Sequence, residues 1–174
     1  MISTRPEQPA DIDSIRELVR LAFTGHPVSQ GTEPMIIDAL RADGALALSL
    51  VAEVDGEVVG HIAYSAAGIG EPASGVGDSP SGWFLVGPLA VLPEHQGKGI
   101  GRALIEESLD IMRSRDARGC VLVGDPDLYR RFDFRRCSGV TWPGVPDEYV
   151  LSLPFSTEEP VGAIAYHPAF LVGT

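Results

Sequence analysis

The chain has 174 residues, of which 44% are apolar and 21% are charged, a composition typical of a folded globular protein rather than a disordered one. This length predicts a single domain over residues 1–174. No stretch approaches the roughly 18 apolar residues of a membrane span. Thirteen basic and twenty-four acidic residues give a net charge of −11, which disfavours nucleic acid and anionic membranes as partners.

The first part of the chain predicts two helices between two strands. Residues 1–6 are typical of a short edge strand, and Asp11 fits the N-cap of a following helix. The apolar residues of that helix recur at helical spacing: Ile12, Ile15, Leu18, Val19 and Ala22. Thr32-Glu33-Pro34 opens a second helix, because proline is tolerated in the first turn. The apolar run from Leu46 to Val54 predicts a strand.

A hairpin and a long loop are expected next. Asp55-Gly56 is a strong hairpin signal, so residues 57–64 are predicted to return as the antiparallel partner strand. Residues 66–82 are rich in glycine, serine and proline, which predicts a long loop. The apolar run Trp83 to Leu92 predicts a strand, and Gly87-Pro88 within it indicates a bulge or a break in pairing.

The second half predicts one long helix and four shorter elements. Glycines 97, 99 and 101 precede a helix whose apolar residues are Ala103, Leu104, Ile105, Leu109 and Met112. The shorter elements are a strand at 120–123, a helix at 127–132, and strands at 149–153 and 161–166. Helices around a mixed sheet predict an α/β or α+β sandwich.

The cysteines and histidines predict neither a disulfide framework nor a metal site. Cys120 and Cys137 form no CxxC and are expected to be buried small hydrophobes. The histidines are dozens of residues apart, at positions 26, 61, 95 and 167. With no apolar signal segment at residues 1–6, a metal-free cytoplasmic protein is expected.

The basic residues are concentrated in one segment. Residues 98–136 hold nine of the thirteen, with seven acids, for a local charge of +2 that leaves −13 elsewhere. One interpretation is a solvated helix face. The other is an anionic ligand at this segment and a cationic or neutral second substrate near the acidic remainder.

The glycine-rich turn favours a phosphate-binding site. Three glycines between a strand and a helix let the backbone approach an anion, and the first N–H groups of the helix point at it. A Rossmann fingerprint is excluded by Arg102 and a Walker A loop by Gly99 after Lys98. A ligand-free turn is the alternative, against which the charges of Lys98 and Arg102 argue.

Three stretches resemble one family. Gln96 to Gly101 match the Gln/Arg-x-x-Gly-x-Gly/Ala signature of the GNAT superfamily of N-acetyltransferases, and Gly87 to Pro93 resemble its fourth strand. Leu128 to Phe134 are similar to its Tyr-x-x-x-Gly-Phe segment, although Asp133 stands where the family usually has glycine. The resemblance covers residues 83–136 and is greatest to the bacterial branch called YhbS-like.

The resemblance implies a GNAT fold: a mixed, mostly antiparallel sheet splayed into a V between its fourth and fifth strands, flanked by helices. Acetyl-CoA is expected in the V as the co-substrate. The implied cofactor-binding residues are Leu89, Ala90, Val91, Gln96, Gly97, Lys98, Gly99, Ile100, Gly101 and Arg102. The first three would pair with the pantetheine arm through their backbone, and the turn would hold the pyrophosphate.

Catalytic candidates follow from the same resemblance. Tyr129 falls where the family often has the acid that protonates the departing CoA sulfur, with a core tyrosine as the alternative. The general base is left open among four residues: Glu33, His61, Glu94 and His95.

The expected function is acetyl transfer from acetyl-CoA to a primary amine of a small molecule or protein by direct attack. A non-catalytic acyl-CoA-binding regulatory module and transfer of a longer acyl chain are the alternatives. Residues 140–174 contain four acids and no lysine or arginine, which favours a cationic acceptor. A homodimer is left open.

Overall fold

The computed structural model describes residues 1–73 and 79–173. Its centre is a sheet with the path β1-β2-β3-β4-β5-β7, to which β8 and β6 are joined beside the end of β3. The strands are β1 (Ile2–Pro6), β2 (Leu48–Val54), β3 (Glu57–Ile69), β4 (Trp83–Val91), β5 (Gly119–Val123), β6 (Val140–Thr141), β7 (Val150–Pro154) and β8 (Gly162–Ala165). Pairing along the path is antiparallel except between β4 and β5, which run parallel.

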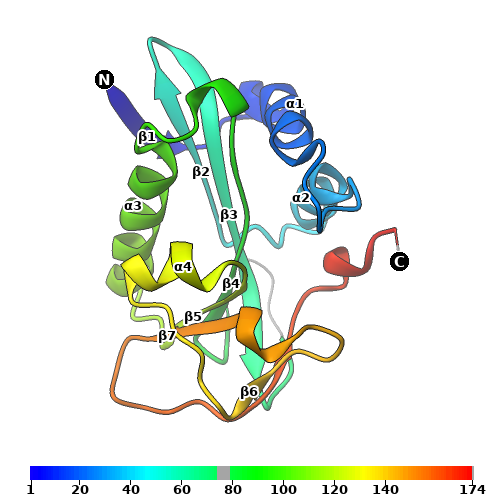
Figure 1. The fold of residues 1–174 in the computed structure, drawn as a ribbon, viewed down its shortest axis with the longest axis vertical. Helices are drawn as coiled ribbons and strands as arrows, with labels where there is room; N and C mark the ends of the chain where they lie inside the picture. Colours follow the sequence, from blue (N-terminus) through cyan, green and yellow to red (C-terminus); the bar gives the residue numbers. More distant parts are fainter. Residues whose placement is uncertain (74–78, 174) are drawn as a thin grey trace.

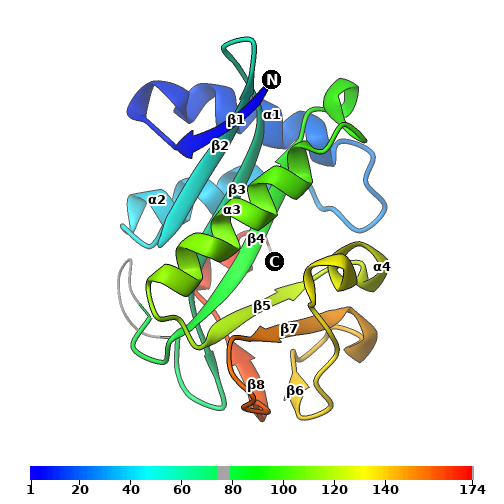
Figure 2. The ribbon, with the colours of Figure 1, turned by 90° about the vertical axis from the view of Figure 1, so that its left-hand side faces the viewer.

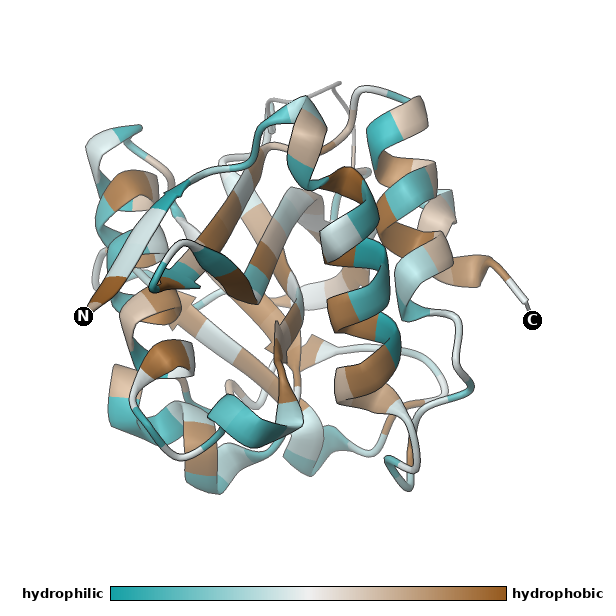
Figure 3. Ribbon diagram, turned by 90° about the horizontal axis from the view of Figure 1, so that it is seen from above, coloured by the Kyte–Doolittle hydropathy of each residue, from teal (hydrophilic) through white to brown (hydrophobic). Residues whose placement is uncertain are grey.

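Helices cover both faces of the sheet (Figure 1). They are α1 (Ile12–Phe23), α2 (Glu33–Ala42), α3 (Ile100–Ser114) and α4 (Pro126–Tyr129), with 3-10 turns η1 (Pro9–Asp11), η2 (Pro93–His95), η3 (Arg130–Phe132), η4 (Asp147–Tyr149) and η5 (Pro168–Leu171). Figure 1 shows α3 on one side of the strands and α1 and α2 on the other. The helices carry both apolar and polar residues (Figure 3). The buried apolar ones of α1 and α3 belong to the core cluster that packs on the sheet. No helix in the described part of the chain is long and apolar enough to cross a membrane.

The splayed V that the resemblance implied is confirmed. β4 pairs with β5 only from Trp83 to Leu85, after which the two strands diverge (Figure 2). On the other side of β4, Gly87 and Pro88 lie opposite Ala63 alone, because the register shifts between Ile62 and Tyr64. This is a β-bulge, as the Gly87-Pro88 pair predicted.

The expected helices and strands are largely confirmed, with two differences in the strands. Residues 66–69 belong to β3, not to a loop, because they pair with β4 and β8. The rest of the predicted loop lies partly outside the described residues. The two-residue strand β6 was missed.

Asp11 does not cap α1 as predicted. Its carboxylate accepts from Arg5 at 2.7 Å and from the backbone N–H of Gln8 at 2.7 Å, and no side-chain cap bond forms at the start of α1. The ion pair with Arg5, which also binds Glu53 on β2, thus ties η1 to the edge of the sheet.

The close packing of α3 on the sheet depends on Gly60. A Cβ at this position in β3 would lie 2.7 Å from Cγ2 of Ile100 and 3.0 Å from Cδ1 of Leu104. Ile100 is the first residue of α3, so this contact holds the beginning of the helix beside β4.

Candidate functional site

The open edge of β4 lies inside the V. Beyond Leu85 this edge has no β5 partner, while the other edge pairs Leu89 with Ile62 and Ala90 with His61. The Leu92 N–H donates to the carbonyl of Val59, 2.9 Å away. Since backbone groups alternate in direction along a strand, those of Leu89 and Val91 face the open edge. Leu89 and Val91, two of the three expected pantetheine-contacting residues, therefore present backbone groups to the V, where the Val91 carbonyl accepts from Gln96, and Ala90 faces β3.

The glycine-rich turn forms an exposed strand-to-helix connection. Gly97 (φ 73°) and Gly99 (φ 87°) adopt left-handed conformations, and a Cβ at either would meet nothing within 4 Å. The helix begins with the bond from the Ala103 N–H to the Gly99 carbonyl, at 3.0 Å. The N–H groups of the residues between them therefore have no intrahelical acceptor, which suits an anion. The Nε2 of Gln96 donates to the Val91 carbonyl at 3.1 Å, which fixes the segment before the turn to the end of β4.

Most arginines of the basic segment are neutralised by acids. Arg102 pairs with Glu106 at 2.8 Å. Other pairs join Arg113 to Asp110, Arg118 to Glu71 and Glu158, Arg130 to Asp127, Arg135 to Glu159, and Arg136 to Asp147. The solvated-face interpretation thus accounts for most of them. Three of the four acids at residues 140–174 are also paired, so the local field there is weaker than the charge count indicates.

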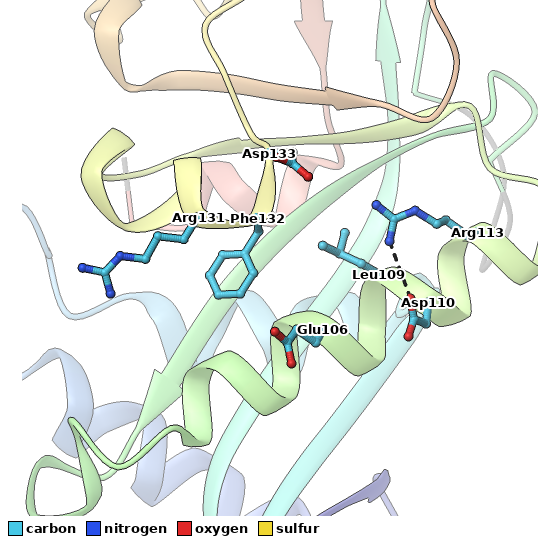
Figure 4. A pocket seen from close by; sticks show the side chains of 7 residues that line it. All are labelled: Glu106, Leu109, Asp110, Arg113, Arg131, Phe132 and Asp133. Atoms are coloured by element: carbon cyan, nitrogen blue, oxygen red, sulfur yellow. Dashed lines mark ion pairs between the residues drawn. The ribbon is translucent and has the colours of Figure 1, made fainter.

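Lys98 and Arg131 differ from these arginines. Neither has an ion pair or hydrogen bond with any residue in the described ranges. Arg131 also lines a hollow of about 310 Å³ between α3 and the α4–η3 segment. In Figure 4 its guanidinium points away from this hollow, toward the side on which α3 begins. The sequence had singled out Lys98, but it did not separate Arg131 from its neighbours.

Tyr129 lies at the end of α4, beside β5. Its ring packs on Gly124, where a Cβ would come within 2.5 Å of Cε2, and meets Phe134 edge-to-face at 5.9 Å. Asp125 caps α4 by accepting from the Asp127 N–H at 2.9 Å. Burial, with a smaller effect of the Asp125 charge, raises the pKa of Tyr129 to about 12. Its hydroxyl forms no hydrogen bond within residues 1–73 and 79–173, so it is a protonated donor without a protein acceptor.

Asp133 occupies the position where the family usually has glycine. Its φ of 68° is left-handed, so the turn is kept despite the side chain. Aspartate tolerates this conformation better than most residues, which explains why the segment from Tyr129 to Phe134 still closes on itself.

The candidate bases lie in different surroundings. Glu94 and His95 are in η2, on the connection before the turn. Glu33 begins α2, and its Oε2 is buried with no hydrogen-bond partner in the described part of the chain. His61 is fully buried on β3, next to Ala90. The structure does not bring these four together.

His61 belongs to a partly buried polar network that the sequence did not predict. Its Nε2 is 2.7 Å from Oγ of Ser49 on β2, and Ser49 binds Oε2 of Glu7. Arg41 of α2 binds both Glu7 oxygens, at 2.9 and 3.1 Å. Burial alone would raise the pKa of Glu7, but the nearby His61, 3.7 Å away, and hydrogen bonds from Arg41 and Ser49 outweigh it and lower the pKa to about 2. Burial lowers the pKa of His61, and the Glu7 carboxylate opposes this.

The cysteines and acids do not assemble into other chemistry. Cys120 and Cys137 are both free and buried. Within the described ranges, no group of three or more His, Cys, Asp or Glu residues is arranged to hold a metal ion.

Comparisons with known proteins agree with this architecture. The sequence model of the Acetyltransferase (GNAT) family matches residues 12–139. The uncharacterized N-acetyltransferase YhbS of Escherichia coli K12 is 34% identical over 153 residues, which is 83% of each chain. A GNAT family acetyltransferase from Brucella melitensis, solved with acetyl-CoA, is 44% identical with a TM-score of 0.82 over 98% of both chains. Escherichia coli YhbS, solved with CoA, has a TM-score of 0.85 and 28% identity, covering 99% of this chain and 93% of its own.

Proposed function

This chain belongs to the GNAT acetyltransferase family, and on that premise we propose that it transfers an acetyl group from acetyl-CoA to a primary amine. The observation that carries the proposal is the V itself, with an unpaired edge of β4 that leads directly into the glycine-rich turn. The solved Brucella and Escherichia coli relatives contain acetyl-CoA and CoA, respectively, which supports the same ligand here.

The co-substrate is proposed to bind through backbone groups first and charges second. Amide groups of Leu89 and Val91 pair with the pantetheine arm as an added strand. The N–H groups from Gly97 to Arg102 hold the pyrophosphate at the beginning of α3. Lys98 and Arg131 are the free cations for the phosphates, because Arg102 already pairs with Glu106.

The chemistry is a direct attack. A neutral amine nitrogen adds to the thioester carbonyl carbon, and the oxyanion collapses with cleavage of the C–S bond. The sulfur leaves as a thiolate and takes the proton of the Tyr129 hydroxyl. With a pKa raised to about 12 by burial, the phenol is fully protonated at neutral pH and has a proton to give.

The test measures free thiol released from acetyl-CoA with a panel of small amines and basic peptides. Tyr129→Phe is expected to lower kcat by roughly 10- to 10⁴-fold with little change in CoA affinity. Tyr166→Phe, another half-buried tyrosine that packs against Trp142, is the matched control and is expected to keep kcat.

The alternatives give different results in this assay. A regulatory acyl-CoA-binding module would bind CoA without releasing thiol for any amine. An enzyme for longer acyl chains would prefer butyryl- or octanoyl-CoA to acetyl-CoA. If the Tyr129→Phe variant keeps the wild-type turnover, Tyr129 is a packing residue and not the acid.

A further inference from the structure

The partly buried network fixes which nitrogen of His61 carries a proton. The ionised Glu7 carboxylate only accepts hydrogen bonds, so the Ser49 hydroxyl donates to it. Ser49 Oγ then accepts from Nε2 of His61, 2.7 Å away. The neutral imidazole therefore has its hydrogen on Nε2 and a lone pair on Nδ1.

That lone pair has no protein partner. Nδ1 of His61 is buried and forms no hydrogen bond with any residue of the described ranges. An unsatisfied buried polar atom costs about 1–3 kcal/mol, so it calls for a reason beyond packing. The other nitrogen, by contrast, is held by a relay that ends in a bidentate Glu7–Arg41 ion pair.

The position of His61 relates it to the reacting centre. His61 pairs with Ala90, and Ile62 pairs with Leu89, so its backbone lies one strand away from the open edge of β4. Its side chain is on the face of the sheet opposite to Gly60, which contacts α3. The proposed pyrophosphate site is at the beginning of α3, so His61 lies on the opposite side of the sheet, beneath α1.

Building on the proposed function, we propose that His61 is the general base of the transfer. Its Nδ1 takes one proton from the acceptor ammonium through a bridging water, and the neutral amine attacks the thioester. As the C–S bond breaks, the thiolate gains the proton of Tyr129, and the second proton of the attacking nitrogen passes through solvent to the resulting tyrosinate. The imidazolium returns its proton to solvent after release of the amide.

The relay stabilises the imidazolium in this step. When His61 is protonated, its positive charge is 3.7 Å from Oε2 of Glu7, with Ser49 between them. Arg41 opposes this charge from α2. The buried residues of α1 that cover the sheet are apolar: Ile15, Leu18 and Val19. Glu7 and Arg41 are thus the charged groups that determine the pH at which His61 accepts a proton.

The first variant is His61→Gln, whose amide can still donate to Ser49 but offers no basic nitrogen. We expect kcat to fall about 100-fold or more near pH 7, with KM for the amine changed only a few-fold. Activity is expected to recover as the pH rises, because free amine becomes more abundant. A weakly basic amine, already neutral at pH 7, is expected to lose much less than a strongly basic one.

The second measurement is the acidic limb of the pH profile of kcat/KM. Glu7→Gln removes the charge that raises the pKa of His61, so the limb is expected to move to lower pH. Arg41→Gln removes a charge that lowers this pKa, so the limb is expected to move to higher pH. Weakened packing alone does not shift the limb in opposite directions for two partners of one ion pair.

Matched serine variants complete the test. Ser49→Ala leaves the imidazole in place but breaks the relay, and is expected to lower kcat about tenfold. Ser65→Ala removes another buried hydroxyl from the same face and is expected to leave kcat and the pH profile unchanged.

Suppose that the wild-type protein is active. If His61→Gln then keeps the wild-type pH profile, or if Glu7→Gln and Arg41→Gln shift the acidic limb in the same direction, the proposed base is wrong and the proposed function stands. A wild-type protein that releases no thiol overturns the proposed function as well. If His61→Gln fails to fold, Ser49→Ala and Glu7→Gln decide the question.

Discussion

The glycine-rich turn and the partly buried relay are built in opposite ways. The turn at residues 96–102 is exposed and continuous in sequence, and its candidate contacts come mainly from backbone N–H groups. The relay consists of side chains from three separate segments: His61 is fully buried, and Ser49 and Glu7 are half-buried. The turn can thus change without affecting the core, whereas a change in the relay disturbs charge pairs that hold α2 on the sheet.

This difference predicts which property each variant alters. Variants of the turn that keep its left-handed glycines are expected to change ligand affinity at nearly constant stability. Variants of the relay are expected to change stability and pH dependence together, because a buried charge that loses its partner is penalised.

The largest expected effect is at Gly99. Gly99→Glu places a carboxylate in the proposed phosphate site and strains a left-handed residue, so CoA binding by calorimetry is expected to be abolished. Gly56→Glu is the matched control, since Gly56 has φ 81° and equally open surroundings in the distant β2–β3 hairpin. Equal CoA affinity for the two folded variants would show that the turn is not the phosphate site.

The next effect concerns stability in acid. The pKa of Glu7 is lowered to about 2 in the folded protein. Its ionised carboxylate therefore adds to the free energy of unfolding above about pH 4.5, and this contribution is lost as the pH falls toward 2. This contribution is about 3 kcal/mol. Urea unfolding at pH 7 and pH 3 is expected to show a smaller loss of stability in Glu7→Gln than in the wild type.

Glu17→Gln is the control for that measurement. Glu17 also pairs with an arginine and has a lowered pKa, but its side chain is 58% exposed. Solvent screening makes such pairs weak, so this variant is expected to follow the wild type at both pH values. An identical acid response of both variants would contradict the distinction between the buried and exposed pairs.

The smallest expected effect separates two cations of the turn. Lys98→Ala is expected to weaken CoA binding about three- to tenfold at low salt and less at high salt. Arg102→Ala is expected to have a smaller effect, because Arg102 is already paired with Glu106. A larger loss for Arg102→Ala would mean that the ion pair breaks to bind phosphate.

Local features were predictable from the sequence because their signals lie within a few residues. Asp55-Gly56 has positive φ at both positions, as its hairpin requires, and residues 97–101 form the strand-to-helix turn that their glycines predicted. The Gly87-Pro88 bulge was predictable for the same reason. The role of Tyr129 came from resemblance and stays a prediction.

Contacts between distant segments were decided only by the tertiary structure. The sequence predicted a loop at residues 66–69, but these residues form the end of β3. Gly68 and Ile69 pair there with β8, which lies almost 100 residues later in the chain. Nothing near His61 in the sequence indicates Glu7 or Arg41, since burial and pairing at one sheet face depend on the whole fold. The same holds for the arginines at 118, 135 and 136, whose acid partners follow 11 to 40 residues later. The sequence by itself determined the turns, most elements and the family, because these depend on local conformation and short motifs, whereas the pairing of charges and the environment of each titratable group required the folded chain.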